Sequence, residues 1–423
     1  KYSSDGIYLP RAQSQHAYTA LENLEARVGD IDAFVAKELG YASVEEMAYG
    51  PDGKSRLAGY QIDALGLAIY ANKLGKGFII GDDTGVGKGR KAAALFVWAK
   101  ENKKIPIFVT VTDSLYTSMY KDLLDIGHGD IRIGMTNENS AVEQDLGGGE
   151  SRNIFENTDK NKQGNALIKH LTTTGALPNN VDAVFTTYSQ LNGGTGSGVR
   201  QNAIASLVAA GKAVLIMDEA HNAAGVTTVE LEKKSKGQNE FFMSLLTGQG
   251  LLGKNSSGDP IDAPDTWSPP PTVYLSATFA KRPDNMPLYI HTNLRYAANT
   301  PRELTVLFGK GVKTDVLQQV SSEMLVESGS MLRRERSYEG VVMDFVTDVA
   351  NGPRDAREVD RVTVILRSLV NADRALNEWV KTKEAQTLII TTLGPTGSHI
   401  GAVGPLAFEQ AKRSVFTSVV HNY

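Results

Sequence analysis

The sequence predicts an α/β fold in which a parallel sheet lies between two layers of helices. From residue 75 onward, short apolar runs alternate with helical stretches, a pattern typical of strands joined by helical crossovers. The runs are continuously apolar, which indicates a sheet buried on both faces. The predicted strands are 78–80, 105–111, 183–186, 213–217 and 272–275. The helices predicted between them include 90–100, 115–124 and 202–210.

The composition is that of an ordinary globular protein. The chain has 423 residues, of which 41% are hydrophobic and 22% charged, enough apolar material for a sizeable core. The net charge of −4 excludes a uniformly basic nucleic-acid-wrapping protein, so any contact with nucleic acid must be local. The absence of cysteine excludes disulfides and thiol catalysis and fits the cytoplasm. No apolar run approaches the ~20 residues needed to cross a bilayer, so we expect no membrane partner.

An N-terminal helical extension is predicted for residues 1–50, where apolar side chains recur at three- to four-residue spacing. Pro51-Asp52-Gly53 then gives a turn signal, and residues 51–345 are predicted to form the main domain. Two parts of this domain, about 127–165 and 222–271, are long and rich in turn-forming residues. Structureless loops of that length are uncommon in a compact domain, so we expect insertions there.

The end of the chain has no clear pattern. Residues 346–423 are expected to be a linker or the start of a further domain, because too few residues remain for a second domain of similar size. The chain begins with Lys1 and has no initiator Met. We therefore expect it to be part of a longer polypeptide.

A glycine-rich turn follows the first predicted strand, and a helix follows the turn. Glycines let backbone N–H groups converge on phosphate oxygens, and the helix N-terminus adds the positive end of its dipole. Lys88 would place a positive charge near the β- and γ-phosphates. The alternative is a glycine-rich turn without a ligand. The candidate nucleotide-binding residues are Asp82, Thr84, Gly85, Val86, Gly87, Lys88, Gly89 and Arg90. One of them departs from the usual loop, because Gly89 stands where a Ser or Thr hydroxyl normally coordinates Mg²⁺.

Two carboxylates stand at the end of another apolar strand, in the run Asp218-Glu219-Ala220-His221. Open α/β sheets bind ligands at the carboxyl ends of their strands. Asp218 would hold Mg²⁺ directly or through water, and Glu219 would orient or deprotonate an attacking water. Without the glycine-rich loop, the same residues would more simply be a solvated strand end.

Hydroxyl residues end two further predicted strands. Ser276 and Thr278 belong to the run Ser276-Ala277-Thr278, which is weak alone but stands in order after the glycine-rich loop and the acidic strand end. With His221 these two residues complete the predicted catalytic set. Thr187 and Tyr188 end the strand before the acidic one. Their hydroxyls would touch a nucleic-acid backbone or cap the next helix.

Taken in order, these motifs resemble those of the strawberry notch-like helicases of superfamily 2. That family also carries Gly after the loop Lys, which turns Gly89 into a point of agreement. Residues 29–41 are similar to bacterial and phage members in particular, and the whole resemblance spans roughly residues 18–345. Further stretches that carry it are Ser114-Leu115, Asp122-Leu123, Asp125-Ile126-Gly127, Asn285-Met286 and 331–341.

The resemblance implies the first RecA-like lobe of a P-loop NTPase, which binds and hydrolyses ATP with Mg²⁺. It implies a helicase or translocase that acts on nucleic acid, for which we prefer DNA to RNA although the motifs do not distinguish the two. It also implies a second RecA-like lobe from the rest of a longer chain. Gln61 matches the position of an adenine-reading glutamine in superfamily 2, although an exposed helical glutamine is an equally good interpretation. Ser114 is a candidate nucleic-acid contact.

The resemblance to phage-borne members leads to two more specific expectations about biological role and location. These are a role in antirestriction or DNA protection, and delivery of the protein from a virion to the host cell. The alternative function is a non-hydrolysing nucleotide-binding structural module of a large phage virion protein. Intact Lys88, Asp218 and Glu219 argue against it.

The densest basic cluster consists of Arg333, Arg334 and Arg336. These side chains would meet phosphates or a second lobe. The alternative is a charged helix face paired with Glu335 and Glu339.

Overall fold

The computed structural model describes residues 7–336 with several gaps, and eight isolated residues beyond them. The gaps are 139, 148–149, 158–165, 192–196, 224–237, 253–254, 256, 258, 280–282, 299 and 309–313. The residues described beyond 336 are 357, 360, 361, 364, 367, 368, 371 and 382. The chain divides into two compact units, Lys1–Glu339 and Gly340–Tyr423. The further domain predicted at 346–423 thus lies almost entirely outside the described residues.

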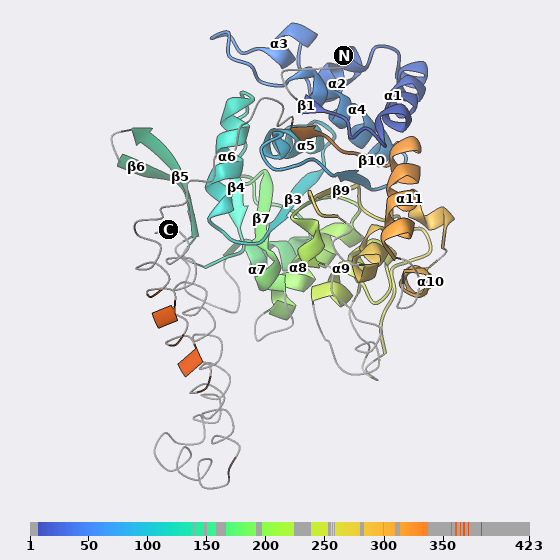
Figure 1. The fold of residues 1–423 in the computed structure, drawn as a ribbon. Coiled ribbons are helices and arrows are strands. Elements are labelled where there is room, and N and C mark those ends of the chain that lie inside the picture. The colour runs from blue at the N-terminus through green and yellow to red at the C-terminus, as the bar shows by residue number, and fades with distance from the viewer. Residues whose placement is uncertain are drawn as a thin grey trace. The chain divides into compact units, whose positions relative to one another are not determined.

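A seven-stranded sheet forms the centre of the first unit (Figure 1). The strand order is β10-β2-β9-β8-β3-β7-β4, and every neighbouring pair is parallel. The prediction of a parallel α/β fold is therefore confirmed. The strands are β2 (Phe78–Ile80), β3 (Ile105–Thr110), β4 (Ile133–Met135), β7 (Ala183–Thr187), β8 (Ala213–Asp218), β9 (Thr272–Leu275) and β10 (Met331–Leu332).

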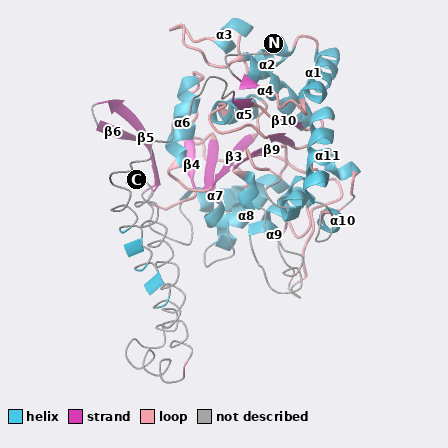
Figure 2. Ribbon diagram, viewed as in Figure 1, coloured by secondary structure: helices cyan, strands magenta, loops and turns pink. Residues whose placement is uncertain are grey.

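Helices cover both faces of this sheet (Figure 1, Figure 2). This arrangement follows from right-handed crossovers, which place a helix on one face when the chain advances along the sheet and on the other when it returns. One layer contains α4 (Gly59–Lys73), α5 (Lys88–Glu101) and α6 (Leu115–Asp125). The other contains α7 (Ala166–Thr174), α8 (Ser197–Ala209) and α9 (Gln238–Thr247). Among the described residues, no helix is long and apolar enough to span a bilayer.

The N-terminal helices pack into the first unit. They are α1 (Ser14–Val28), α2 (Ile31–Glu38) and α3 (Val44–Ala48), and α1 and α2 contact α4, while α1 also contacts α11 (Thr314–Glu327). Apolar residues on α1 and α2, such as Leu24 and Val35, are buried in the common core. A Cβ at Gly66 would lie 2.8 Å from Ile31 Cγ2, so the close approach of α2 to α4 requires glycine there.

Two small antiparallel pairs lie beside the main sheet. In one, β1 (Ile7–Tyr8) pairs with β11 (Glu335–Arg336). The other is a hairpin of β5 (Ser140–Gly147) and β6 (Glu150–Asn157), within the segment 127–165 where an insertion was expected and no strand was predicted. These strands were not predicted because the segment is rich in Gly and Asn, which are uncommon in strands. The remaining elements are the 3₁₀ helices η1 (Tyr188–Leu191), η2 (Ala220–Ala223), η3 (Pro283–Tyr289) and η4 (Asn293–Tyr296), and the helix α10 (Pro301–Leu307).

Candidate active site

Three of the predicted motifs meet at the carboxyl edge of the sheet. The glycine-rich loop follows β2, Ser276 follows β9, and Asp218 ends β8, and these three strands are neighbours. In the parallel register, Leu275 pairs with both Ile80 and Asp218. The backbone N–H of Ser276 donates to the carbonyl of Ile80 at 3.1 Å. The sheet therefore brings together residues that are separated by more than half of the described chain.

The loop has the backbone conformation that its glycines allow. Gly85 and Gly87 have φ angles of +81° and +75°, a region that L side chains rarely adopt. Gly87 is the N-cap of α5, so the helix begins at Lys88. The Lys88 ammonium donates to the carbonyl of Asp82 at 2.7 Å and thus lies over the loop. Thr84 is exposed on the loop, and Val86 is buried beneath it.

Asp82 anchors the loop from below. Its carboxylate is fully buried, accepts from the backbone N–H of Arg334 at 2.8 Å and forms an ion pair with the fully buried Lys91. Burial lowers the pKa of Lys91, and the neighbouring Asp82 opposes that shift. The Lys91 ammonium also faces the ring of Tyr60, 5.4 Å from its centroid. The carboxylate of Asp82, predicted as a nucleotide ligand, is therefore placed behind the loop.

Gln61 also lies behind the loop. It is 2% exposed, and its Oε1 accepts from the backbone N–H of Ala58 at 2.9 Å. Its Nε2 donates to the carbonyl of Gly87 at 3.3 Å. A Cβ at Gly87 would lie 2.3 Å from that same nitrogen. Neither sequence interpretation included this position, in which the carboxamide braces the loop.

The basic cluster at 333–336 lies in a strand region beside the loop, and the helical interpretation was wrong. Arg334 is 1% exposed, and its Nη2 pairs with Asp63 Oδ2 at 2.7 Å. Burial raises the pKa of Asp63 to about 6, although Arg334 opposes the shift. Arg333 pairs with Asp83 and Glu335 at 3.4 and 3.0 Å.

The third arginine of the cluster lies against the loop itself. The guanidinium carbon of Arg336 is 3.4 Å from the point where a Cβ of Gly85 would be. Arg336 ends the last described strand of the first unit and is exposed. The cluster therefore supplies one exposed positive charge at the rim of the loop.

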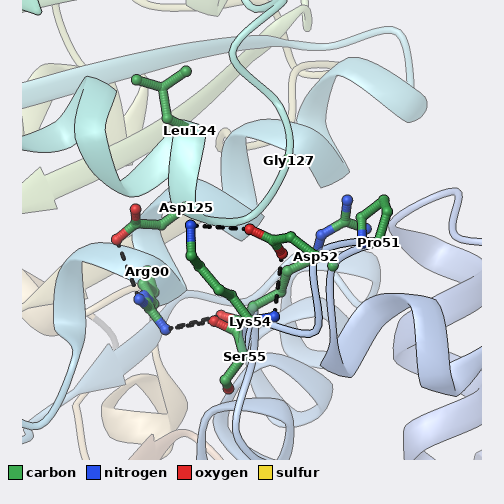
Figure 3. A pocket seen from close by; sticks show the side chains of 10 residues that line it. Pro51, Asp52, Lys54, Ser55, Arg90, Leu124, Asp125 and Gly127 are labelled. Carbon is green, nitrogen blue, oxygen red and sulfur yellow. Dashed lines mark hydrogen bonds and ion pairs between the residues drawn. The ribbon is translucent and has the colours of Figure 1, made fainter. Parts of the chain in front are cut away.

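A cavity of about 310 Å³ lies beside the first turn of α5 (Figure 3). Arg90 forms part of its wall and donates to the Ser55 carbonyl at 3.0 Å and to Asp125 Oδ2 at 3.1 Å. The turn from Gly50 to Arg56 and the end of α6 around Asp125 and Gly127 complete the lining. Both walls carry charged side chains and backbone polar groups. Gly89, one residue earlier, faces the Asp122 carboxylate of α6.

Asp218 and Glu219 differ in their surroundings. The Thr110 hydroxyl donates to Asp218 Oδ2 at 2.8 Å. Burial raises the pKa of Asp218, although this hydrogen bond opposes the shift. Glu219 has a φ of +46°, which costs energy in a residue with a side chain and is found mainly at functional sites. Sequence reasoning missed Thr110, although it is a hydroxyl residue at the end of a predicted strand, as is Thr187.

His221 links the acidic strand end to the next strand. Its Nδ1 lies 2.9 Å from Ser276 Oγ, 3.3 Å from Thr278 Oγ1 and 3.3 Å from Glu219 Oε2. Ser276 is fully buried, and its Oγ accepts from the backbone N–H of Thr278 at 3.3 Å. The predicted residues His221, Ser276 and Thr278 are therefore in contact, and they connect the carboxylates to β9.

The three candidate nucleic-acid residues are placed differently. Ser114 is exposed, and its hydroxyl lies 2.8 Å from that of Thr112. Thr187 and Tyr188 are buried. The Tyr188 hydroxyl donates to the carbonyl of Asp218 at 2.8 Å, so this side chain supports the acidic strand end.

The residues at the strand ends are suited to a magnesium ion that also binds phosphate and water, and less to a metal held by protein ligands alone. In the part of the chain that the structure describes, no group of three or more His, Cys, Asp or Glu side chains could hold a metal ion. Mg²⁺ commonly uses one or two carboxylates and completes its shell with water and phosphate oxygens. Asp218 offers such a carboxylate beside the loop. Lys88 and the loop N–H groups would hold the phosphates.

Comparison with known proteins agrees with this geometry. The model of the family described as P-loop containing NTP hydrolase pore-1 matches residues 38–354. Among curated proteins, none matches the chain.

Two solved structures from Sulfolobus solfataricus are similar to this chain. One is a SWI2/SNF2 ATPase core in complex with dsDNA, with 16% identity, a TM-score of 0.37 and an alignment over 80% of this chain and 57% of that one. The other is a SWI2/SNF2 ATPase core domain, with 13% identity, a TM-score of 0.37 and coverage of 84% and 62%. The chain thus spans about three fifths of the length of each. The match of the family model over most of the chain, together with the loop and the parallel sheet, shows that this protein belongs to the P-loop containing NTP hydrolase pore-1 family.

Proposed function

We propose that this chain is the ATP-hydrolysing first lobe of a superfamily 2 helicase or translocase of the strawberry notch-like type. The observation that carries the proposal is that Lys88, Asp218 and His221 all lie at the carboxyl edge of the sheet. A P-loop that faces two carboxylates contains the parts that phosphoryl transfer to water requires. The choice of this type over other P-loop NTPases rests on the sequence motifs.

Each of these residues has a different role in the proposed hydrolysis of ATP. The loop N–H groups and Lys88 hold and orient the β- and γ-phosphates. Mg²⁺, held through Asp218, would neutralise charge that develops on the phosphate oxygens. Glu219, which is partly exposed, accepts a proton from the attacking water or orients it. His221 keeps Glu219 in contact with Ser276, so the state of the nucleotide would affect β9.

The nucleoside part of ATP would lie beyond the first turn of α5. The α-phosphate binds near the first N–H groups of such a helix, so ribose and base extend past Arg90 toward the cavity of Figure 3. Its volume, about 310 Å³, falls at the lower end of the range for small-molecule pockets. Gln61, in this proposal, keeps Gly87 in place and does not read the base directly.

Arg336 and a second lobe would complete the charge around the γ-phosphate. Arg336 already lies at the rim of the loop, where a guanidinium could stabilise the transferred phosphoryl group. A second RecA-like lobe from a longer chain would add further arginines, as P-loop motors commonly require.

Nucleic acid is the proposed partner, with DNA preferred to RNA on the strength of the motif resemblance. Ser114, exposed at the start of α6, is the candidate backbone contact among the predicted residues. Tyr188 is assigned instead to the support of Asp218. A role in protecting phage DNA rests on the resemblance to phage members alone.

The test is ATP hydrolysis by this chain and by any longer parent polypeptide, with Mg²⁺, in the presence and absence of single- and double-stranded DNA and RNA. We expect turnover that DNA stimulates and that Glu219→Gln lowers by about 100-fold or more without weakening ATP binding. Glu22→Gln, a change at an exposed position on α1, is the control. ATP binding without turnover in the parent would instead favour a structural nucleotide-binding module.

A further inference from the structure

Gly89 lacks a side chain at the position where phosphate loops usually supply a metal ligand. In most such loops a Ser or Thr follows the lysine, and its hydroxyl coordinates Mg²⁺. Here the helix continues from Lys88 to Gly89 with an intact first turn. The loop therefore has the lysine and the N–H groups but not the oxygen that completes the metal site.

An oxygen from another helix lies where that side chain would be. Asp122 belongs to α6, which packs against α5. Its Oδ2 is 1.9 Å from the ideal Cβ position of residue 89, and its carboxyl carbon is 2.8 Å from it. A serine hydroxyl would lie one bond length from that Cβ. The Asp122 carboxylate thus occupies the place of the missing side chain, and it would have to move to admit a larger residue at position 89.

In the described part of the chain, no residue donates a hydrogen bond to this carboxylate or forms an ion pair with it, although the charges of Arg90 and Lys121 act on it from a distance. Arg90, the nearest cation, directs its guanidinium to Asp125 and to the backbone of the turn before α4. The Asp122 side chain is partly buried, and a cation bound to its carboxylate would offset the cost of that burial.

The geometry points to Asp122 as a protein ligand of the nucleotide's Mg²⁺, directly or through one water, in place of the hydroxyl that Gly89 lacks. This assignment rests on the proposed ATP site. Carboxylate oxygens are the protein ligands that Mg²⁺ prefers. Asp122 and Asp218 would then approach the ion from α6 and β8, and the phosphates of ATP would supply the remaining oxygens.

The test measures how much Mg²⁺ strengthens ATP binding to the full chain. ATP affinity is determined by titration calorimetry in Mg²⁺ and again in EDTA, and the ratio of the two dissociation constants is the metal gain. Asp122→Asn keeps the size of the side chain and removes its charge. Asp130→Asn, which changes a more exposed carboxylate just beyond the same helix, is the matched control.

We expect Asp122→Asn to leave ATP affinity in EDTA within about two-fold of wild type and to reduce the metal gain by about ten-fold or more, since even indirect partners of metal ligands contribute 10- to 100-fold. Asp130→Asn should retain the full gain. The double variant Gly89→Ser with Asp122→Ala moves the oxygen back onto the loop and should recover most of the gain. In Gly89→Ser alone, the Asp122 side chain must turn away, because the new Cβ would collide with its carboxylate.

A full metal gain in Asp122→Asn, with normal ATP affinity in EDTA, would overturn the assignment and leave the proposed ATP site intact. Failure of the double variant to recover any gain, although it folds and binds ATP in EDTA, would also count against it. If wild type binds no ATP under either condition, the proposed function fails, and this assignment fails with it.

Discussion

Arg334 and Asp63 form an almost completely buried ion pair, with 2.7 Å between Nη2 and Oδ2. The pair joins α4 to the end of β10, and the backbone of the same arginine holds the loop. Its N–H donates to Asp82, and its carbonyl accepts from the N–H of Asp83 at 2.9 Å. Arg334 therefore contributes both to the stability of the first unit and to the conformation of the phosphate loop.

Removal of one partner of this pair should be strongly destabilising. Asp63→Asn leaves the Arg334 charge buried without its counter-ion, and we expect it to lower the free energy of unfolding by about 3–5 kcal/mol. Denaturant unfolding measures the change. Asp52→Asn, which breaks an exposed pair with Lys54, should change the unfolding free energy far less, because solvent screens exposed ion pairs. Equal losses in the two variants would contradict the importance of burial here.

The loop lysine should matter for nucleotide binding and not for folding. Lys88→Ala removes the ammonium that lies over the loop but leaves the buried Asp82–Lys91 pair beneath it. We expect ATP binding to be lost while the unfolding free energy changes by less than about 1 kcal/mol. Fluorescent ATP titration and thermal unfolding report the two quantities. Lys37→Ala, on an exposed face of α2, should change neither, and unchanged ATP binding in Lys88→Ala would sink the loop assignment.

A substitution at Tyr188 can distinguish a structural role of this residue from a role in nucleic-acid binding. Its hydroxyl is buried and donates to the Asp218 carbonyl. We expect Tyr188→Phe to lower the unfolding free energy by about 1 kcal/mol and to leave DNA affinity unchanged. Tyr49→Phe, at a residue that is 56% exposed, serves as the control for stability. A loss of DNA affinity in Tyr188→Phe at unchanged stability would instead support direct contact with the strand.

His291 should make the stability of the first unit depend on pH. Burial, with Arg295 nearby, lowers its pKa from 6.5 to about 4, and its Nε2 is buried without a hydrogen-bond partner in the described structure. Between these values the unfolded chain binds a proton that the folded chain does not. Stability should therefore fall as pH drops from 6.5 toward 4, by up to about 3 kcal/mol from this group.

The matched comparison is His291→Phe, which cannot titrate. Its unfolding free energy should fall less steeply over that pH window than that of wild type. His16→Phe changes a more exposed histidine and is the control for replacement of an imidazole by a phenyl ring. Parallel pH curves for His291→Phe and wild type would contradict the expected contribution.

Sequence patterns were sufficient for the strands that carry the site. The five predicted strands are continuous apolar runs, and such runs identify buried strands wherever they lie. β4 is interrupted by Gly134, and β10 has only two residues, so neither forms a continuous apolar run. Because β10 was missed, the basic cluster that follows it was given a helical interpretation.

The supporting contacts of the site could not be predicted from the sequence. Asp63 and Arg334 are 271 residues apart, and no local pattern pairs residues over that distance. The fit of Asp122 against Gly89 depends on how closely α6 packs on α5. Tyr188 was predicted to contact a nucleic-acid backbone or to cap the next helix. Its packing against Phe242, with ring centroids 5.6 Å apart, depends on tertiary structure that the local sequence does not reveal.

The position of β10 and Arg334 late in the chain determines when the phosphate loop can reach its final conformation during synthesis on the ribosome. Asp82 and its partner Arg334 are 252 residues apart in the chain. At about 5–20 residues per second, roughly ten to fifty seconds separate the synthesis of the two. The loop is synthesised early, without the backbone partners that hold it in the folded protein. We expect nucleotide binding to be the last property that the growing lobe acquires.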